Sequence, residues 1–139
     1  MSLKEIQNGR LIIKKRLTNN FMKQIALVGL GGMIGSILRY LAAIGIRPSP
    51  FPYATLLVNV IGSLLIGIIM GWSAKQANAD YWRLFLATGI CGGFTTFSTF
   101  AWENLQLLYQ QRYTHFCVYA GGTLILGLIA VAIGYWLTK

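Results

Sequence analysis

Apolar residues fill four long stretches of the chain, and charged side chains are nearly absent from each of them. A hydrocarbon core about 30 Å thick is crossed by roughly 20 apolar residues in helical conformation. Each stretch meets that length. We therefore predict an all-α integral membrane protein with four transmembrane helices, placed roughly at residues 24–46, 53–74, 82–108 and 114–137.

The segments between these stretches are short and rich in residues that break helices. All three prolines of the chain lie within residues 48–52, between the first and second stretches. Polar turns at residues 75–80 and 110–112 separate the other stretches. None of these segments has room for a soluble domain, so we expect one transmembrane domain over residues 22–139.

Composition supports a membrane protein and argues against a cytosolic enzyme or a nucleic-acid binder. Hydrophobic residues make up 55% of the chain and charged residues only 11%, against about 25% charged in a soluble domain. The net charge of +9 is concentrated near the N-terminus, because residues 1–23 hold six of the twelve basic residues and one of the three acidic ones. Motifs typical of metalloproteases, P-loop proteins and serine hydrolases are missing from the sequence.

The first 21 residues predict a basic juxtamembrane arm that is poorly ordered. The orientation in the membrane that the positive-inside rule predicts depends on whether the charges of this arm are counted. Without residues 1–22, the two sides of a four-helix protein carry four and three basic residues, and no orientation is favoured. With them the count is nine against three, which favours a cytoplasmic N-terminus. A nearly balanced chain can insert both ways, which makes an antiparallel dimer possible.

The third stretch contains an unusual run of glycines and hydroxyl residues at residues 89–100, GICGGFTTFSTF. Paired glycines weaken a helix, and a helix break at membrane depth is tolerated only where it is buried in protein or lines a cavity. Carbonyl groups at such a break can coordinate a cation. The alternative is close helix packing through small residues, with the hydroxyls bonded back to the helix.

Two aromatic residues and one amide form a candidate anion site. Phe97 and Phe100 are three positions apart and share a helix face; they either pack in the membrane or present the positive edges of their rings to an anion. Asn59 belongs to a polar stripe with Thr55 and Ser63 on the second stretch. Its amide either joins two helices or donates to an anion.

Other polar residues in the spans also have two interpretations. Arg39 either extends its side chain to the membrane interface or forms a basic vestibule that attracts anions. Thr123, with Tyr119 four positions earlier, adds hydroxyls to a polar track in the fourth stretch. Glu103 is the one acidic residue within a span that a proton-coupled transporter could use, and we place it at the interface. Gly31 and Gly35 form a GxxxG packing motif.

Three segments together resemble the Fluc/CrcB fluoride channel family. They are GGMIGSILRY at residues 31–40, TLLVNVIGSLLIG at 55–67 and GICGGFTTFSTF at 89–100. The resemblance covers about residues 22–135. It implies an antiparallel dual-topology homodimer in the cell inner membrane, with a break in the third helix and two fluoride pores lined by both subunits.

The resemblance also assigns roles to individual residues. It implies that the fluoride pore is lined by Asn59, Phe97, Phe100, Ser98, Thr99 and Thr123, and that Arg39 lies in the vestibule. It further implies that backbone carbonyls of Gly92 and Thr95 hold a structural sodium ion at the dimer centre, which is required for function but is not transported. The expected partners are fluoride, the lipid bilayer and a second copy of the chain, and not nucleic acid.

The expected function is therefore a passive, fluoride-selective channel that exports fluoride from the cytoplasm and so reduces its toxicity. Two alternatives remain open from the sequence. The first is a small four-helix exporter of organic cations, which would depend on Glu103. The second is a structural subunit that packs through its glycines and transports nothing.

Overall fold

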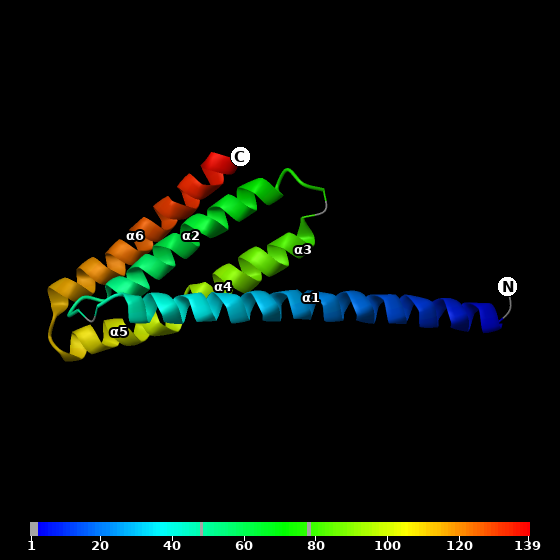
Figure 1. Ribbon diagram of the computed structural model, residues 1–139, viewed down its shortest axis with the longest axis horizontal. Coiled ribbons are helices and arrows are strands. Elements are labelled where there is room, and N and C mark those ends of the chain that lie inside the picture. The colour runs from blue at the N-terminus through cyan, green and yellow to red at the C-terminus, as the bar shows by residue number, and fades with distance from the viewer. Residues whose placement is uncertain (1–2, 48, 78) are drawn as a thin grey trace.

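The computed structural model describes residues 3–47, 49–77 and 79–139, and this part of the chain is helical with short connections (Figure 1). In chain order the elements are α1 (Leu3–Gly45), α2 (Tyr53–Ser73), α3 (Asp80–Trp82), η1 (Arg83–Cys91), α4 (Gly92–Phe94), α5 (Phe97–Tyr109) and α6 (Tyr113–Thr138).

Within the described residues, four helical segments are long and apolar enough to cross a membrane. They span Leu17–Gly45, Tyr53–Ser73, Asp80–Tyr109 and Tyr113–Thr138. The four predicted transmembrane helices are confirmed, with ends that differ by a few residues, except that the first begins earlier. The third segment is assembled from α3, η1, α4 and α5 rather than from one uniform helix.

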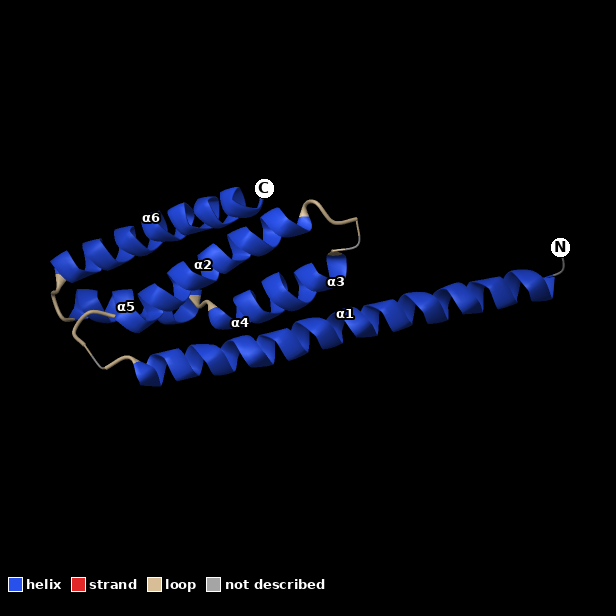
Figure 2. Ribbon diagram, turned by 45° about the horizontal axis from the view of Figure 1, so that its top comes forward, coloured by secondary structure: helices blue, strands red, loops and turns tan. Residues whose placement is uncertain are grey.

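Helix α1 continues well beyond the bundle at its N-terminal end (Figures 1 and 2). It begins at Leu3, so it contains most of the segment predicted to be a separate basic arm. Residues 1 and 2 of that arm lie outside the described residues. The division into an arm at 1–21 and a channel domain at 22–139 stays a prediction.

Glycines allow the helices to pack closely in two places. A Cβ on Gly31 would lie 2.9 Å from the Cα of Gly89, and one on Gly35 would lie 2.8 Å from the nitrogen of Phe94. Both glycines of the predicted GxxxG motif therefore face the third span. On the other side of the bundle, a Cβ on Gly67 of α2 would lie 2.9 Å from a backbone nitrogen of α6. Larger side chains would push these helices apart.

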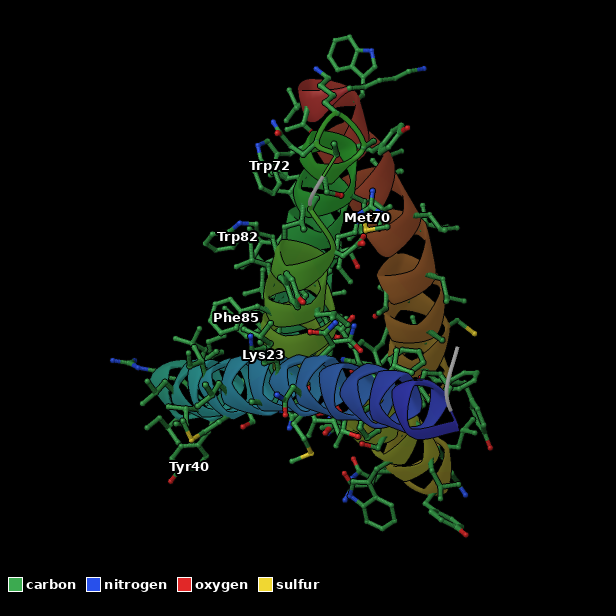
Figure 3. All side chains as sticks on the ribbon, turned by 90° about the vertical axis from the view of Figure 1, so that its right-hand side faces the viewer. Lys23, Tyr40, Met70, Trp72, Trp82 and Phe85 are labelled. Atoms are coloured by element: carbon green, nitrogen blue, oxygen red, sulfur yellow. The ribbon has the colours of Figure 1, made fainter. Side chains whose placement is uncertain are left out.

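The outer surface of the bundle is apolar. Leu128 is 73% exposed, and large apolar side chains are exposed on all four spans. Trp72 and Trp82 point away from the bundle near one end (Figure 3), where amphipathic indole rings favour the interface between lipid and water. This surface fits a lipid environment and leaves apolar area for contact with another protein.

Candidate functional site

Two residues with extended backbone separate α4 from α5. Thr95 has φ −74° and ψ 158°, and Thr96 has φ −149° and ψ 117°. The hydroxyl of Thr96 caps the start of α5, because it accepts a hydrogen bond from the backbone nitrogen of Thr99 at 3.2 Å. Threonine suits this position because its side-chain oxygen can replace a missing helical acceptor. The interruption therefore lies inside the run of glycines and hydroxyl residues.

Asn59 of α2 satisfies the backbone at this interruption. The nitrogen of Thr96 donates to Oδ1 of Asn59 at 2.9 Å, and Nδ2 of Asn59 donates to the carbonyl oxygen of Thr96 at 3.2 Å. An amide group has two N–H donors, so a second donor remains for another acceptor. Asn59 thus joins two helices, which is one of its two interpretations from the sequence. Its remaining N–H donor is still available for the other, which is donation to an anion.

Arg39 points toward the same interruption. Its Nη1 donates to the carbonyl oxygen of Thr95 at 3.3 Å, and its side chain is partly buried. This contact favours a position beside the interruption over the interpretation in which the side chain extends to the membrane interface. The guanidinium satisfies the carbonyl of Thr95, because an exposed carbonyl at a helix break needs a hydrogen-bond donor.

Near the interruption, backbone carbonyl oxygens are available as ligands for a cation. In an uninterrupted helix the nitrogen of Thr96 would donate to the carbonyl of Gly92, but it donates to Asn59 instead. The carbonyl of Thr95 has a second lone pair beside its bond to Arg39. Among the described residues, no group of three or more His, Cys, Asp or Glu side chains is placed to hold a metal. Oxygen donors of this kind fit a hard cation such as sodium.

A groove of about 370 Å³ runs beside the interruption, between α2, α5 and α6. The rings of Phe97 and Phe100 have centroids 5.8 Å apart and are tilted by 41°. Phe97 is 78% exposed. The groove brings together four residues of the predicted pore, which are Asn59, Phe97, Phe100 and Thr123.

The remaining predicted residues lie around the groove. Thr99 and Arg39 line a second cavity of about 280 Å³, which shares Thr96 with the groove. Ser98 lines neither cavity, but its hydroxyl lies 3.2 Å from that of Thr96. The hydroxyl of Thr123 donates to the carbonyl of Tyr119 at 2.7 Å, so its oxygen atom is available to a neighbour mainly as an acceptor.

Glu103, which is predicted from the sequence to lie at the membrane interface, belongs to a polar network with Thr55 and Tyr119. Its Oε1 accepts a hydrogen bond from the Thr55 hydroxyl at 2.9 Å, and its Oε2 accepts one from the Tyr119 hydroxyl at 2.6 Å. Tyr119 is fully buried, and its ring centroid lies 5.1 Å from that of Phe100. Glu103 lies three positions after Phe100 and shares its helix face, but its bonds to Thr55 and Tyr119 join different helices, which local spacing does not indicate.

Comparisons with known proteins agree with this architecture. The family described as CrcB-like protein, Camphor Resistance (CrcB), matches residues 26–135. A protein of Phocaeicola vulgatus named fluoride-specific ion channel FluC is 43% identical over 122 residues, which cover 85% of this chain and all of that protein. One from Thermus thermophilus with the same name is 45% identical over 117 residues, covering 82% of this chain and 94% of that protein.

These relatives are named as ion channels and not as enzymes. The match reaches into each of the four helices that, among the described residues, can span a membrane. The chain is a multi-pass membrane protein that belongs to the CrcB-like family.

Proposed function

We propose that this chain is a passive, fluoride-selective ion channel that exports fluoride from the cytoplasm and so reduces fluoride toxicity. The observation that carries the proposal is the groove in which the Asn59 amide meets the rings of Phe97 and Phe100. The similarity to proteins named fluoride-specific ion channels supports the same choice of ion.

The chemistry of the groove suits a small anion that has lost its water. Removing an ion from water into a medium of low dielectric costs tens of kcal/mol by Born estimates. Asn59 offers an N–H donor, and the two phenyl rings offer edges with partial positive charge. These groups are neutral, so they bind an anion without a full counter-charge. A conducting site must bind an ion strongly enough to admit it and weakly enough to release it.

No coupled energy source is required for export. A membrane potential that is negative inside drives an anion outward, with about 2.3 kcal/mol per charge for every 100 mV. Both oxygens of Glu103 accept hydrogen bonds from hydroxyl groups within the protein, which gives this carboxylate a role in holding Tyr119 and Thr55. We therefore assign it no part in proton coupling.

The backbone oxygens of Gly92 and Thr95 would hold a sodium ion that is structural and is not transported. The bond from Thr96 to Asn59 releases the Gly92 carbonyl from its helical donor, which supports this assignment. When bound, the ion would supply a fixed positive charge beside the groove. Arg39 already donates to Thr95 and contributes a second positive charge near this position.

An antiparallel dual-topology homodimer would complete the pore. Phe97 is 78% exposed in the single chain, although it lies at the candidate site. Burial of this ring against a second copy would enclose the groove and remove apolar surface from lipid. Each pore would then be lined by residues of both subunits.

A variant of Glu103 separates this channel from the alternative cation exporter. Glu103→Gln keeps one oxygen acceptor, and its NH2 group can donate to the oxygen of the other hydroxyl, but it removes the titratable group. We expect purified Glu103→Gln in liposomes to retain fluoride efflux when a protonophore has collapsed any proton gradient. Fluoride transport by the wild-type protein that requires a proton gradient, and is abolished in Glu103→Gln, would contradict a passive channel.

A further inference from the structure

A cavity lies on the outer surface of the bundle between α1 and α3, at the end where the third span begins. Its volume is about 480 Å³. It is lined from α3 by Tyr81 and from α1 by Lys23, Ala26, Leu27 and Leu30. None of these residues lines the groove beside the interruption. The cavity is therefore separate from the candidate pore.

Aromatic side chains place this cavity at the level of the membrane interface. Tyr81 is 47% exposed and Trp82 is 54% exposed, and Trp82 points away from the bundle (Figure 3). Tyrosine and tryptophan rings favour the region where lipid headgroups meet the hydrocarbon core. The chain just before Tyr81 carries the exposed charged residues Lys75 and Asp80, which belong outside that core. A group bound between Lys23 and Tyr81 therefore lies at the depth of the headgroups.

The cavity has a cationic end and an apolar end. Among the described residues that line it, Lys23 is the one charged residue, and its ammonium group has three N–H donors. The hydroxyl of Tyr81 is a further donor. Ala26, Leu27 and Leu30 lie three, four and seven positions after Lys23, so they form one stripe along α1 that leads from the headgroup level into the hydrocarbon core. This arrangement matches a phospholipid, in which a charged phosphate is joined to apolar chains.

The continuation of α1 adds positive charge on the same side of the membrane. Helix α1 passes α3 and continues beyond it to Leu3 (Figures 1 and 2), about 30 Å along its axis from Lys23. The sequence of this part contains one acidic residue, Glu5, and five further basic residues, Lys4, Arg10, Lys14, Lys15 and Arg16. Clusters of basic residues next to a span attract anionic lipids. The lipids around Lys23 are thus enriched in negatively charged headgroups.

We propose that this cavity binds an anionic phospholipid. The Lys23 ammonium and the Tyr81 hydroxyl hold its phosphate, and an acyl chain lies along the apolar stripe of α1. A second copy of the chain is a less suitable occupant, because the groove that it would enclose lies between α2, α5 and α6. The proposal does not depend on which ion the chain conducts.

The test is native mass spectrometry of the purified full chain in detergent, titrated with phosphatidylglycerol or with phosphatidylcholine of the same acyl chains. We expect the wild type to bind phosphatidylglycerol more tightly. Lys23→Gln should weaken the binding of phosphatidylglycerol about fivefold, which is the effect of one basic group at an anionic surface, and should leave phosphatidylcholine binding unchanged. Lys23→Arg keeps the charge and should bind as the wild type does.

Two further variants separate this cavity from the general positive charge of the chain. Lys75→Gln removes an exposed lysine at the same end of the bundle that does not line the cavity, so it should change lipid binding much less. Ala26→Trp keeps every charge but fills the cavity, and should weaken the binding of phosphatidylglycerol. Lys23 and Ala26 are both exposed, so their variants should elute as the wild type does in size-exclusion chromatography.

Equal affinities of the wild type for the two lipids would overturn the proposal. So would wild-type binding of phosphatidylglycerol by Lys23→Gln or by Ala26→Trp, or an equal loss in Lys23→Gln and Lys75→Gln. Displacement of phosphatidylglycerol by inorganic phosphate at the same concentration would assign the site to a free anion and would also contradict it.

Discussion

Phe97 and Phe100 carry the most specific chemistry of the candidate pore. Their spacing places them on one helix face, and the structure puts their ring centroids 5.8 Å apart in the groove. Phe100 is fixed by its contact with Tyr119 at 5.1 Å, whereas Phe97 is 78% exposed. The two rings therefore have different environments, and the second would be enclosed by the partner subunit of the proposed homodimer.

Replacement of either ring by an aliphatic side chain should slow fluoride transport. Phe97→Ile and Phe100→Ile keep apolar bulk but remove the positive ring edge, whose interactions contribute about 0.5–1.5 kcal/mol. We expect liposome efflux to fall by about two- to tenfold in each variant, with unchanged elution of the purified protein in size-exclusion chromatography. Phe116→Ile on α6 is the matched control. Wild-type efflux in both pore variants would exclude a role for the ring edges.

At the scale of elements, the interruption between α4 and α5 depends on a side chain from another helix. Asn59 bonds both to the nitrogen and to the carbonyl of Thr96. Two backbone groups without partners at membrane depth would be costly. The extended conformation at Thr95 and Thr96 is thus supported by α2, and α2 is held in turn by close packing against α6 through Gly67.

Loss of the Asn59 amide should destabilise the third span. Asn59→Ala removes the partners of the Thr96 nitrogen and carbonyl, and each unsatisfied buried group costs about 1–3 kcal/mol. We expect a lower melting temperature in detergent, by several degrees, together with loss of fluoride efflux. Ser63→Ala, which alters another groove residue one turn along α2, should cost much less. Equal melting temperatures of the two variants would show that Asn59 does not support the interruption.

The sequence predicts the spans well because membrane thickness sets the length of an apolar helix. The sequence also indicates close helix packing by α1, since Gly31 and Gly35 are small residues at GxxxG spacing. The wide helix η1 has no comparable signal, because any residue can adopt a π-type turn when neighbouring helices favour it. The residue pattern of the third span therefore does not predict the π-helical segment.

The polar network of the site was harder to predict than its individual residues. Thr55 and Glu103 are 48 positions apart, and Asn59 and Thr96 are 37 apart. Such bonds depend on how the helices are rotated about their axes, which local spacing does not determine. The resemblance to the channel family named Phe97, Phe100 and Asn59, but the sequence alone did not show that Glu103 bonds to Tyr119.

At the scale of the whole molecule, the N-terminal part of α1 controls the charge balance across the membrane. Arg39 points toward the interruption and bonds to Thr95, so it contributes little to either surface. Nine basic residues then lie on the side of the termini and two, Arg47 and Arg112, on the other. Without residues 1–21 the count is four against two.

Removal of the basic arm should therefore increase insertion in both orientations. The positive-inside rule predicts that the full chain inserts mainly with its termini in the cytoplasm. Deletion of residues 1–21 should move a reporter fused to the C-terminus toward a mixed distribution. A full-length variant with glutamine at Lys4, Arg10, Lys14, Lys15 and Arg16 separates charge from length. An identical reporter distribution in all three proteins would contradict this account of orientation.

Antiparallel pairing links this orientation to the function. In the proposed antiparallel homodimer, two opposed copies would enclose Phe97 and would bring four carbonyl oxygens, from Gly92 and Thr95 of each copy, around one sodium ion. The proportion of the two orientations would then limit how many complete pores form.

The most direct measurement compares fluoride and chloride efflux from liposomes that contain the purified wild-type chain. We predict that fluoride leaves rapidly down its gradient while chloride is retained, and that fluoride efflux is lost when sodium is replaced by a large organic cation on both sides. Efflux of both halides at similar rates, or no efflux of fluoride with sodium present, would contradict a fluoride-selective pore built from neutral donors and ring edges.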